Sequence, residues 1–422
     1  MITVNTSGTK LTEKYILSGK IQKKVKMAHE SLHGFDKSCG TGWVDLPTEI
    51  SKTEINTIKD FAKSIQEMCD LFIVIGIGGS YAGANAGLEI FKKANPKTDV
   101  AFLGTSFNAK EIQKVLDIAK TKDVCVNVIS KSGETTETAV TFQIIEELMK
   151  KKYKKGEYRK RIFVTTDYEK GSLRETATKE GYASFVIPRT IGGRYSVFTP
   201  VGLLPLAVGG INIEKVLQGA KVAQSYCSEN DATKNPAYQY ALARYYNHTK
   251  GKKSVEVVAS FDGRLKAFFE WFKQLFAESE GKDKKGLFVS SLNYSTDLHS
   301  FGQFVQEGSP ILFETIIDIK KQNADILLDK VKETSPVYYL NGKSLSEIER
   351  ATLNGVIEAH KLAGVPVITI EVEELNEETF GELLYFFMVA CGMSAYMLGV
   401  NPFNQPGVEA YKQKTREILK IN

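Results

Sequence analysis

The chain has 422 residues, of which 42% are hydrophobic, and this is enough for two domains or one two-lobed unit. The formal net charge of +5 is small for this length and predicts no nucleic-acid surface. The five cysteines are scattered without a CxxC pair and the five histidines show no HExxH spacing. We therefore expect free thiols in a reducing, cytoplasmic compartment and no metal site. The first residues show no signal-peptide pattern.

Residues 1–50 are weakly periodic and are predicted to form a cap segment with one helix over Ser18–Leu32. An amphipathic helix over Ser51–Cys69 then precedes a series of five strands that alternate with helices. These strands are expected at Asp70–Ile77, Asp99–Leu103, Val124–Ile129, Arg161–Thr166 and Ser184–Ile187. Such alternation predicts a parallel sheet with helices on both faces and with ligands at the carboxyl ends of its strands.

The segment Gly192–Gly210 is interrupted by Gly and Pro residues and is expected to cross from the first lobe to the second. One long helical run is expected after this crossing, over Ile213–Tyr246. A second alternation follows, with strands expected at Ser254–Ser260, Gly286–Leu292, Ile311–Ile319, Ala324–Leu328 and Val365–Val372. Its helices are expected at Arg264–Glu280, Asp297–Gln306 and Ser344–Leu362. We predict an α/β fold of two doubly wound lobes with mostly parallel central sheets, divided into a cap at 1–50, lobes at 51–210 and 211–400, and a C-terminal arm and helix at 401–422.

The segment Leu383–Pro402 is uncharged throughout and is long enough to span a membrane. It lacks a basic flank, and the one other comparable segment, Tyr195–Ile213, is broken by Pro and Gly. We interpret both as buried core or subunit-interface elements and expect no membrane partner.

A hydroxyl-rich turn, SKSGETTET (130–138), stands between the third strand of the first lobe and a helix. Backbone N–H groups, the helix dipole and hydroxyl donors together make such a turn a natural seat for a phosphate, although an ordinary Ser/Thr-rich cap fits equally well. The earlier turn Gly76–Ser80 fails the GxGxxG pattern, because position 81 is a tyrosine. It predicts either a close approach of backbone to a small ligand or glycines that serve strand–helix packing alone.

The helix over Arg264–Glu280 has an aromatic buried face, while Glu270, Gln274 and Glu278 share another side. A partly buried carboxylate in the last turn would suit a general base, but a solvated glutamate on an amphipathic helix fits the same spacing. His299 lies off the apolar face of the following helix, and a lone histidine of this kind is more often structural than catalytic.

Arg194 follows two glycines that would let a guanidinium approach a ligand, and the alternative is a turn arginine in a surface ion pair. Gln405 and Lys412 lie across a helix start near the end of the chain, where simple capping and solvation are the alternative.

These segments, taken in order, resemble the glucose-6-phosphate isomerases over nearly the whole chain. The matching segments are GIGGS (76–80), SKSGETTET (130–138), GGRYSVFTPVG (192–202), QLFAESEGK (274–282), His299 and AYMLGVNPFNQPGVEAYK (395–412). The last of them and GGRYS are the signatures of the family. Arg189 is a departure, because the family usually has a small or acidic residue ahead of GGR.

The resemblance implies a homodimer of two sugar-isomerase-type lobes that interconverts glucose 6-phosphate and fructose 6-phosphate through a cis-enediol, without a cofactor. It implies that Glu278 moves the proton between C2 and C1, that Arg194 stabilises the enediolate, and that Lys412 and the neighbouring subunit's His299 serve ring opening. The implied phosphate and sugar contacts are Gly79, Ser80, Ser130, Lys131, Ser132, Thr135, Gln274 and Gln405. An isomerase that also accepts mannose 6-phosphate and a non-catalytic sugar-phosphate sensor are the alternatives.

Overall fold

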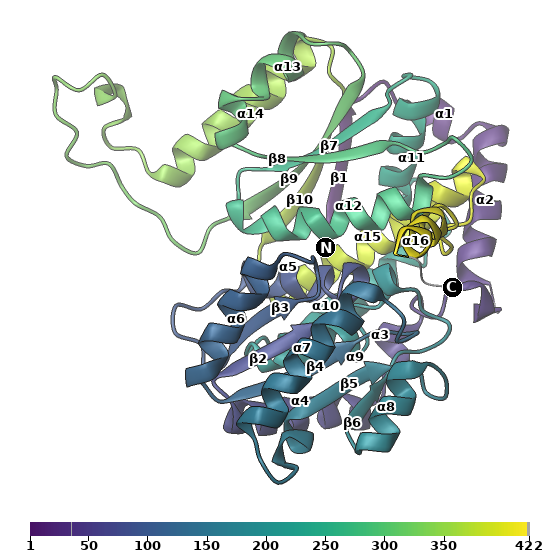
Figure 1. Ribbon diagram of the computed structural model, residues 1–422. Helices are drawn as coiled ribbons and strands as arrows, with labels where there is room; N and C mark the ends of the chain where they lie inside the picture. The colour runs from purple at the N-terminus through teal and green to yellow at the C-terminus, as the bar shows by residue number, and fades with distance from the viewer. Residues whose placement is uncertain (35, 420–422) are drawn as a thin grey trace.

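A computed structural model describes residues 1–34 and 36–419 as two α/β lobes, one below the other in Figure 1. The sheet of the first lobe has the order β3-β2-β4-β5-β6, and all of its strands are parallel. Its strands are β2 (Leu71–Ile75), β3 (Asp99–Leu103), β4 (Val124–Ile129), β5 (Ile162–Thr166) and β6 (Ala183–Val186). Its helices are α4 (Lys52–Met68), α5 (Ala82–Ile90), α6 (Ala109–Thr121), α7 (Thr136–Lys152) and α8 (Ser172–Glu180). Strands β2, β4 and β5 are buried at every position, which explains why their apolar residues do not alternate with exposed polar ones.

The sheet of the second lobe has the order β1-β10-β9-β7-β8 and is parallel except for the pairing of β1 with β10. Its strands are β1 (Thr3–Gly8), β7 (Val255–Ser260), β8 (Phe288–Asn293), β9 (Leu312–Lys321) and β10 (Val367–Glu374). Its principal helices are α11 (Pro236–Thr249), α12 (Lys266–Glu280), α13 (Gly302–Glu307) and α14 (Leu345–Leu362). The predicted fold class is therefore confirmed, whereas the four domain ranges stay a prediction.

Helix α15 (Glu377–Leu398) is the buried centre of the molecule. It packs against α2 (Gly19–His33), α10 (Ile213–Cys227), α11 and α12. Among the described residues it is the one helix that is long and apolar enough to cross a membrane, and 89% of its most apolar window is buried inside the fold. The interpretation of Leu383–Pro402 as a core element is confirmed over the part that α15 covers.

Helix α12 lies between the two lobes and contacts α5 of the first lobe (Figure 1). Its aromatic face is buried, as the spacing predicts. Because its last turn points into the region where the lobes meet, residues near its end can contact segments from both halves of the chain. The remaining helices are α1 (Glu13–Ile16), α3 (Leu46–Glu49), α9 (Pro200–Val208) and α16 (Gly407–Ile418).

Two helix predictions in the middle of the chain are wrong. The single run expected over Ile213–Tyr246 is two helices, α10 and α11, with residues 228–235 between them. Pro236 stands at the first position of α11, where a proline is tolerated, whereas inside one continuous helix it would remove a hydrogen bond and clash with the preceding turn. The Asn235 side chain caps α11 by accepting hydrogen bonds from the next two free backbone N–H groups. The crossing Gly192–Gly210 contains a helix that was not expected, α9, which starts after Thr199 with a proline in its first turn.

Three predictions in the second lobe also need correction. The strand expected at Ala324–Leu328 is absent from the described chain, where Leu327 forms only an isolated bridge to Ser344. The helix expected over Asp297–Gln306 is a 3-10 turn at Thr296–His299 followed by α13, because the backbone leaves the helical region at Ser300. Strand β1 falls within the predicted cap, since TVNTSG has no apolar residue but Val4 and so gives almost no strand signal.

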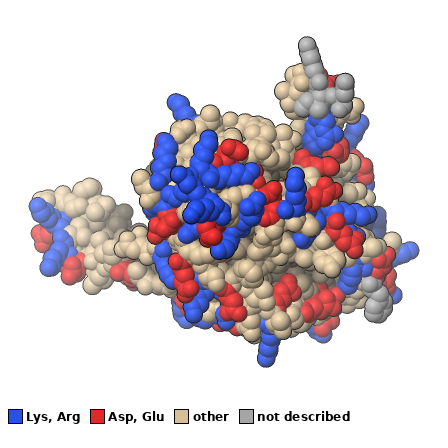
Figure 2. Space-filling model, turned by 60° about the horizontal axis from the view of Figure 1, so that its bottom comes forward, with Lys and Arg blue, Asp and Glu red and all other residues tan. Residues whose placement is uncertain are grey.

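Residues 322–344 connect β9 to α14 and project from the body at the left of Figures 1 and 2. We call this segment the arm, and it is distinct from the C-terminal segment 401–422. The arm exposes several large apolar side chains, namely Ile326, Leu327, Val337, Tyr338 and Tyr339. Elsewhere on the face in Figure 2, basic and acidic side chains are interspersed around one denser group of Lys and Arg. Exposed apolar groups on a projecting segment are typical of a contact surface.

Candidate active site

The carboxyl ends of β2 and β4 meet at the centre of the first sheet. Strand β3 lies on one side of this pair and β5 and β6 lie on the other, so the connections leave in opposite directions. Such a topological switch point is where open α/β sheets bind ligands. The turn Gly76–Ser80 follows β2 and the hydroxyl loop 130–135 follows β4, so both predicted phosphate-binding turns lie at this point.

The hydroxyl loop is built around Ser130, which is buried. Its Oγ accepts the backbone N–H of Gly133 at 3.1 Å and lies 3.5 Å from Thr135 Oγ1. Ser132 is exposed and accepts the N–H of Glu134 at 3.1 Å. Thr135 stands at the N-cap position of α7, and its side chain makes no capping hydrogen bond. The free N-terminus of α7 and the surrounding hydroxyls fit an anion.

Lys131 points away from the middle of the loop. Its Nζ donates to the backbone carbonyls of Arg189 and Ile191 at 2.9 and 3.1 Å, and burial lowers its pKa. The side chain of Arg189, the departure from the family pattern, forms ion pairs with Asp167 and Glu169. Lys131 thus ties the hydroxyl loop to the segment that leads into GGRYS.

Gly79 of the first turn lies directly against Gly193. A Cβ on Gly79 would stand 2.1 Å from the carbonyl carbon and oxygen of Gly193 and 2.6 Å from the backbone N of Arg194. A Cβ on Gly78 would meet Gln274 Nε2 at 2.9 Å. The glycines of this turn therefore allow the first lobe to contact both the arginine segment and α12.

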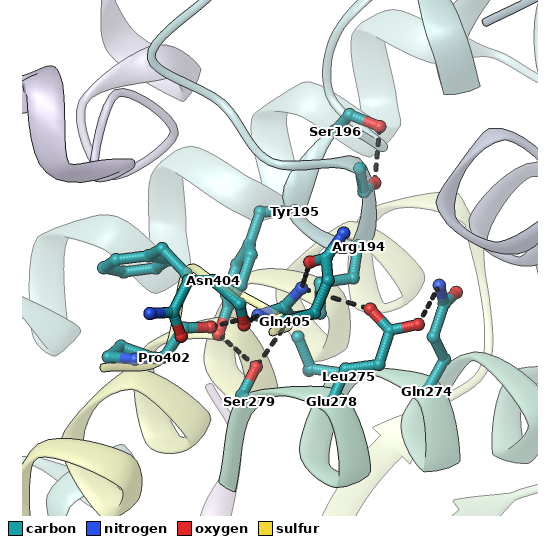
Figure 3. Close-up of polar contacts among 12 residues, drawn as sticks. Arg194, Tyr195, Ser196, Gln274, Leu275, Glu278, Ser279, Pro402, Asn404 and Gln405 are labelled. Carbon is teal, nitrogen blue, oxygen red and sulfur yellow. Dashed lines mark hydrogen bonds and ion pairs between the residues drawn. The ribbon is translucent and has the colours of Figure 1, made fainter. Parts of the chain in front are cut away.

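Arg194 is buried and uses all five of its N–H groups (Figure 3). Nε donates to Ser279 Oγ at 2.9 Å, and Nη1 donates to Glu278 Oε2 at 3.1 Å and to Gln405 Oε1 at 2.7 Å. Nη2 donates to the backbone carbonyls of Pro402 and Asn404. The guanidinium thus joins α12 to segment 401–405, which follows the core helix α15.

Glu278 projects from the last turn of α12 toward Arg194, beside Gln274 (Figure 3). Gln274 Nε2 donates to its other carboxylate oxygen at 3.1 Å, and the Glu278 side chain is 33% exposed. Each carboxylate oxygen therefore has one donor from the protein and stays open on one side. A carboxylate that is oriented but accessible can accept a proton from a bound molecule.

The structure therefore brings Arg194, Glu278, Gln274 and Gln405 together, and the Gly76–Ser80 turn of the first lobe contacts the same group. It does not bring Lys412 or His299 into it. Lys412 lies on α16, where its Nζ pairs with Glu409 at 2.9 Å. His299 is exposed at the end of a 3-10 turn after β8 and forms no side-chain hydrogen bond with a described residue.

Sequence reasoning did not single out Ser279, although it contacts Arg194. A signal for it exists, since Ser279 continues the apolar face of α12 three residues after Phe276 and four after Leu275. A hydroxyl on a buried face requires a hydrogen-bond partner. Lys282 was missed as well. Its Nζ donates to the carbonyls of Ser279 and Asn401, and burial followed by the nearby charge of Arg194 lowers its pKa to about 8.

The arrangement offers an anion seat at one end and a carboxylate beside a guanidinium at the other. Such a pair suits the removal of a proton next to a carbonyl group, because the guanidinium compensates the negative charge that develops on oxygen. Among the described residues, no group of three or more His, Cys, Asp and Glu side chains is arranged to hold a metal ion.

Comparison with known proteins identifies the family. The model of the family described as phosphoglucose isomerase matches residues 59–421. A curated glucose-6-phosphate isomerase from Staphylococcus aureus (strain Newman) is 46% identical over 406 residues, which are 94% of this chain and 91% of the relative. The homologue with the same name from strain NCTC 8325 / PS 47 is 45% identical over 406 residues.

Two solved structures share the whole fold. A hypothetical protein from Thermus thermophilus has a TM-score of 0.90 at 27% identity, and the match covers 99% of this chain and 100% of that one. A glucose-6-phosphate isomerase from Chlamydia trachomatis has a TM-score of 0.82 at 19% identity, and the match covers 100% of this chain and 88% of that one. At this identity the similarity supports the fold alone. With the family match over most of its length and the curated relatives at this identity, the chain belongs to the phosphoglucose isomerase family.

Proposed function

We propose that this enzyme interconverts glucose 6-phosphate and fructose 6-phosphate, with Glu278 as the base and Arg194 as its electrostatic partner. The observation that carries the proposal is the contact of 3.1 Å between Arg194 Nη1 and Glu278 Oε2, beside the Gly78–Gly79 turn of the first lobe. The curated relatives carry this activity in their names.

The chemistry follows from the two side chains. Glu278 takes the proton from C2 of the open-chain aldose, the electron pair of the C–H bond forms the C1–C2 double bond, and charge moves to O1. Because Glu278 becomes neutral in this step, Nη1 loses its negative partner when a new one, the enediolate, appears. The proton on O2 then moves to O1, which shifts the negative charge to O2. Return of the proton from Glu278 to C1, while the electron pair on O2 forms the C2–O2 double bond, gives the ketose and restores the Glu278 carboxylate. The positive charge of Arg194 is thus compensated throughout.

The phosphate of the substrate is proposed to sit in the hydroxyl loop, held by Ser130, Ser132, Thr135 and the Gly79–Ser80 turn. The free helix N-terminus of α7 and the exposed Ser132 hydroxyl support this assignment. Lys131 would contribute its charge from the side, because its Nζ is held by two backbone carbonyls. Anchoring the phosphate supplies orientation, so that the base meets one carbon-bound proton.

Ring opening is proposed to use Lys412 and the His299 of a second copy, in a homodimer. Gln274 and Gln405 would line the sugar near Glu278. The exposed position of His299 and the apolar side chains of the projecting arm support an assembly in which each copy completes the site of the other. A cytoplasmic location is proposed with it, since all five cysteines are unpaired.

The test of the base is Glu278→Gln, assayed by coupling glucose 6-phosphate formation to a dehydrogenase and by calorimetric binding of fructose 6-phosphate. Turnover should fall by several orders of magnitude while binding stays within a few-fold. Glu270→Gln is the matched control, because Glu270 lies on the same helix and pairs only with Lys273 among the described residues. Near-normal turnover in Glu278→Gln would remove the assigned base.

The alternatives have their own discriminating measurements. Mannose 6-phosphate in a parallel coupled assay decides whether the enzyme also accepts the C2 epimer. A non-catalytic sensor would not exchange solvent deuterium into C1 of fructose 6-phosphate, whereas the proposed enzyme should do so. Observed exchange by the pure protein eliminates the sensor.

A further inference from the structure

The five partners of Arg194 differ in how freely they can move. Pro402 and Asn404 contribute backbone carbonyls, and Ser279 contributes a hydroxyl from the buried face of α12. The two Nη1 protons instead go to the long side chains of Glu278 and Gln405. Nη1 is therefore the part of the guanidinium whose partners can turn away and make room for a substrate oxygen.

Ser279 is the one fixed partner on the Nε side, and it is itself held by a directed chain. Its Oγ lies 2.9 Å from Tyr195 Oη, Tyr195 Oη donates to Cys391 Sγ at 3.6 Å, and Cys391 Sγ donates to the Leu275 carbonyl at 3.4 Å. Since the Tyr195 proton goes to sulfur, the Ser279 proton goes to Tyr195. The lone pair of Ser279 is then left for Arg194 Nε (Figure 3).

We propose that Ser279 is a positioning residue that fixes Nε and so aims Nη1 at the oxyanion of the enediolate. The inference rests on the proposed role of Arg194. A planar guanidinium that is anchored through Nε and through Nη2 has no remaining rotation about its long axis. Loss of the Nε anchor leaves the charge in place but releases the direction of Nη1, so it affects the transition state more than the bound substrate.

The variant Ser279→Ala removes one hydroxyl from a fully buried position. We expect kcat to fall by about tenfold to a hundredfold, which corresponds to one hydrogen bond to a charged group, while KM changes by less than about threefold. Affinity for a planar hydroxamate analogue of the enediolate should fall by the same factor as kcat. An unchanged kcat, or equal losses in kcat and in substrate affinity with no preferential loss for the analogue, would overturn the inference.

Ser394→Ala is the matched control for a merely structural role. Ser394 is buried on α15, and its Oγ accepts from another buried arginine, Arg244 Nη1, at 2.8 Å. Its loss should lower thermal stability about as much as Ser279→Ala and keep kcat within about threefold. A loss of kcat equal to that of Ser279→Ala would show that the effect comes from the loss of a buried hydroxyl and not from the direction of Nη1.

A double-mutant cycle with Arg194→Met separates this inference from the proposed function. If Ser279 acts only through Arg194, adding Ser279→Ala to Arg194→Met should lower kcat no further. A full additional loss in the double variant would refute action through Arg194. If Arg194→Met alone leaves kcat unchanged, the proposed function fails instead. Ser279→Cys, which conserves the volume and keeps a weaker acceptor, should show a smaller loss and serves if Ser279→Ala does not fold.

Discussion

Gly79→Ala should disable the enzyme through a collision of two backbones. The added Cβ would stand 2.1 Å from the Gly193 carbonyl, and ordinary contact begins near 3.4 Å, so the two turns must separate by about 1.3 Å. The next residue after Gly193 is Arg194, whose backbone N would stand 2.6 Å from the same Cβ. A displacement of about 1 Å at a catalytic group can cost about a hundredfold in rate. We therefore expect kcat/KM to fall by about a hundredfold or more.

Steady-state kinetics in both directions, with circular dichroism to verify folding, provide the assay. Gly192→Ala is the matched control, because a Cβ there meets nothing within 4 Å and its φ is −77°. It lies in the same segment and should keep kcat/KM within about threefold. A folded Gly79→Ala enzyme with activity close to that of the wild type would refute the view that this contact sets the position of Arg194.

Three further predictions concern stability, pH and binding. Arg244→Met should lower the free energy of unfolding by about 3–5 kcal/mol in a denaturant titration, because it leaves the fully buried Glu256 and Glu280 without their partner; a loss below about 1 kcal/mol would contradict this. Burial lowers the pKa of Lys282 to about 8, against 10.5 in the unfolded chain. Between pH 8 and pH 10.5 the unfolded chain therefore binds more protons than the folded chain, and the free energy of unfolding of the wild type should rise with pH over this range. Lys282→Met should remove that rise, which we expect to be about 1 kcal/mol because the side chain is partly exposed and solvent screens its charge. Equal slopes of stability against pH in the two proteins would disprove it. Ser132→Ala should raise KM for the phosphorylated sugar about tenfold with little change in kcat, and an unchanged KM would place the phosphate elsewhere.

The first lobe was predictable from sequence almost strand by strand. Strands β2, β4 and β5 are buried on both faces, and such strands appear in the sequence as short runs rich in apolar and β-branched residues, too short for buried helices. Strand β1 gives no such signal, because it owes its place to backbone pairing with β10 rather than to apolar side chains. The arm has apolar residues without a buried partner in the described chain, so the expectation of a strand there had a pattern but no sheet edge to join.

The candidate site shows a second limit of prediction from sequence, which concerns contacts between residues far apart in the chain. Spacing alone favoured a solvated Glu278, and only the resemblance to a family brought it together with Arg194, which lies 84 positions away in sequence. Hydrogen bonds between side chains so far apart leave no local periodicity. Ser279 was detectable in principle as a hydroxyl on an apolar helix face, whereas the carbonyls of Pro402 and Asn404 carry no side-chain signal at all.

The most direct test of the account is a crystal structure of the enzyme with a planar hydroxamate analogue of the enediolate 6-phosphate. The account predicts the phosphate within hydrogen-bond distance of Ser130, Ser132 and Thr135, and the hydroxamate oxygens facing Glu278 and Arg194 Nη1. A phosphate bound away from the hydroxyl loop, or a hydroxamate that leaves the Glu278–Arg194 contact untouched, would contradict it.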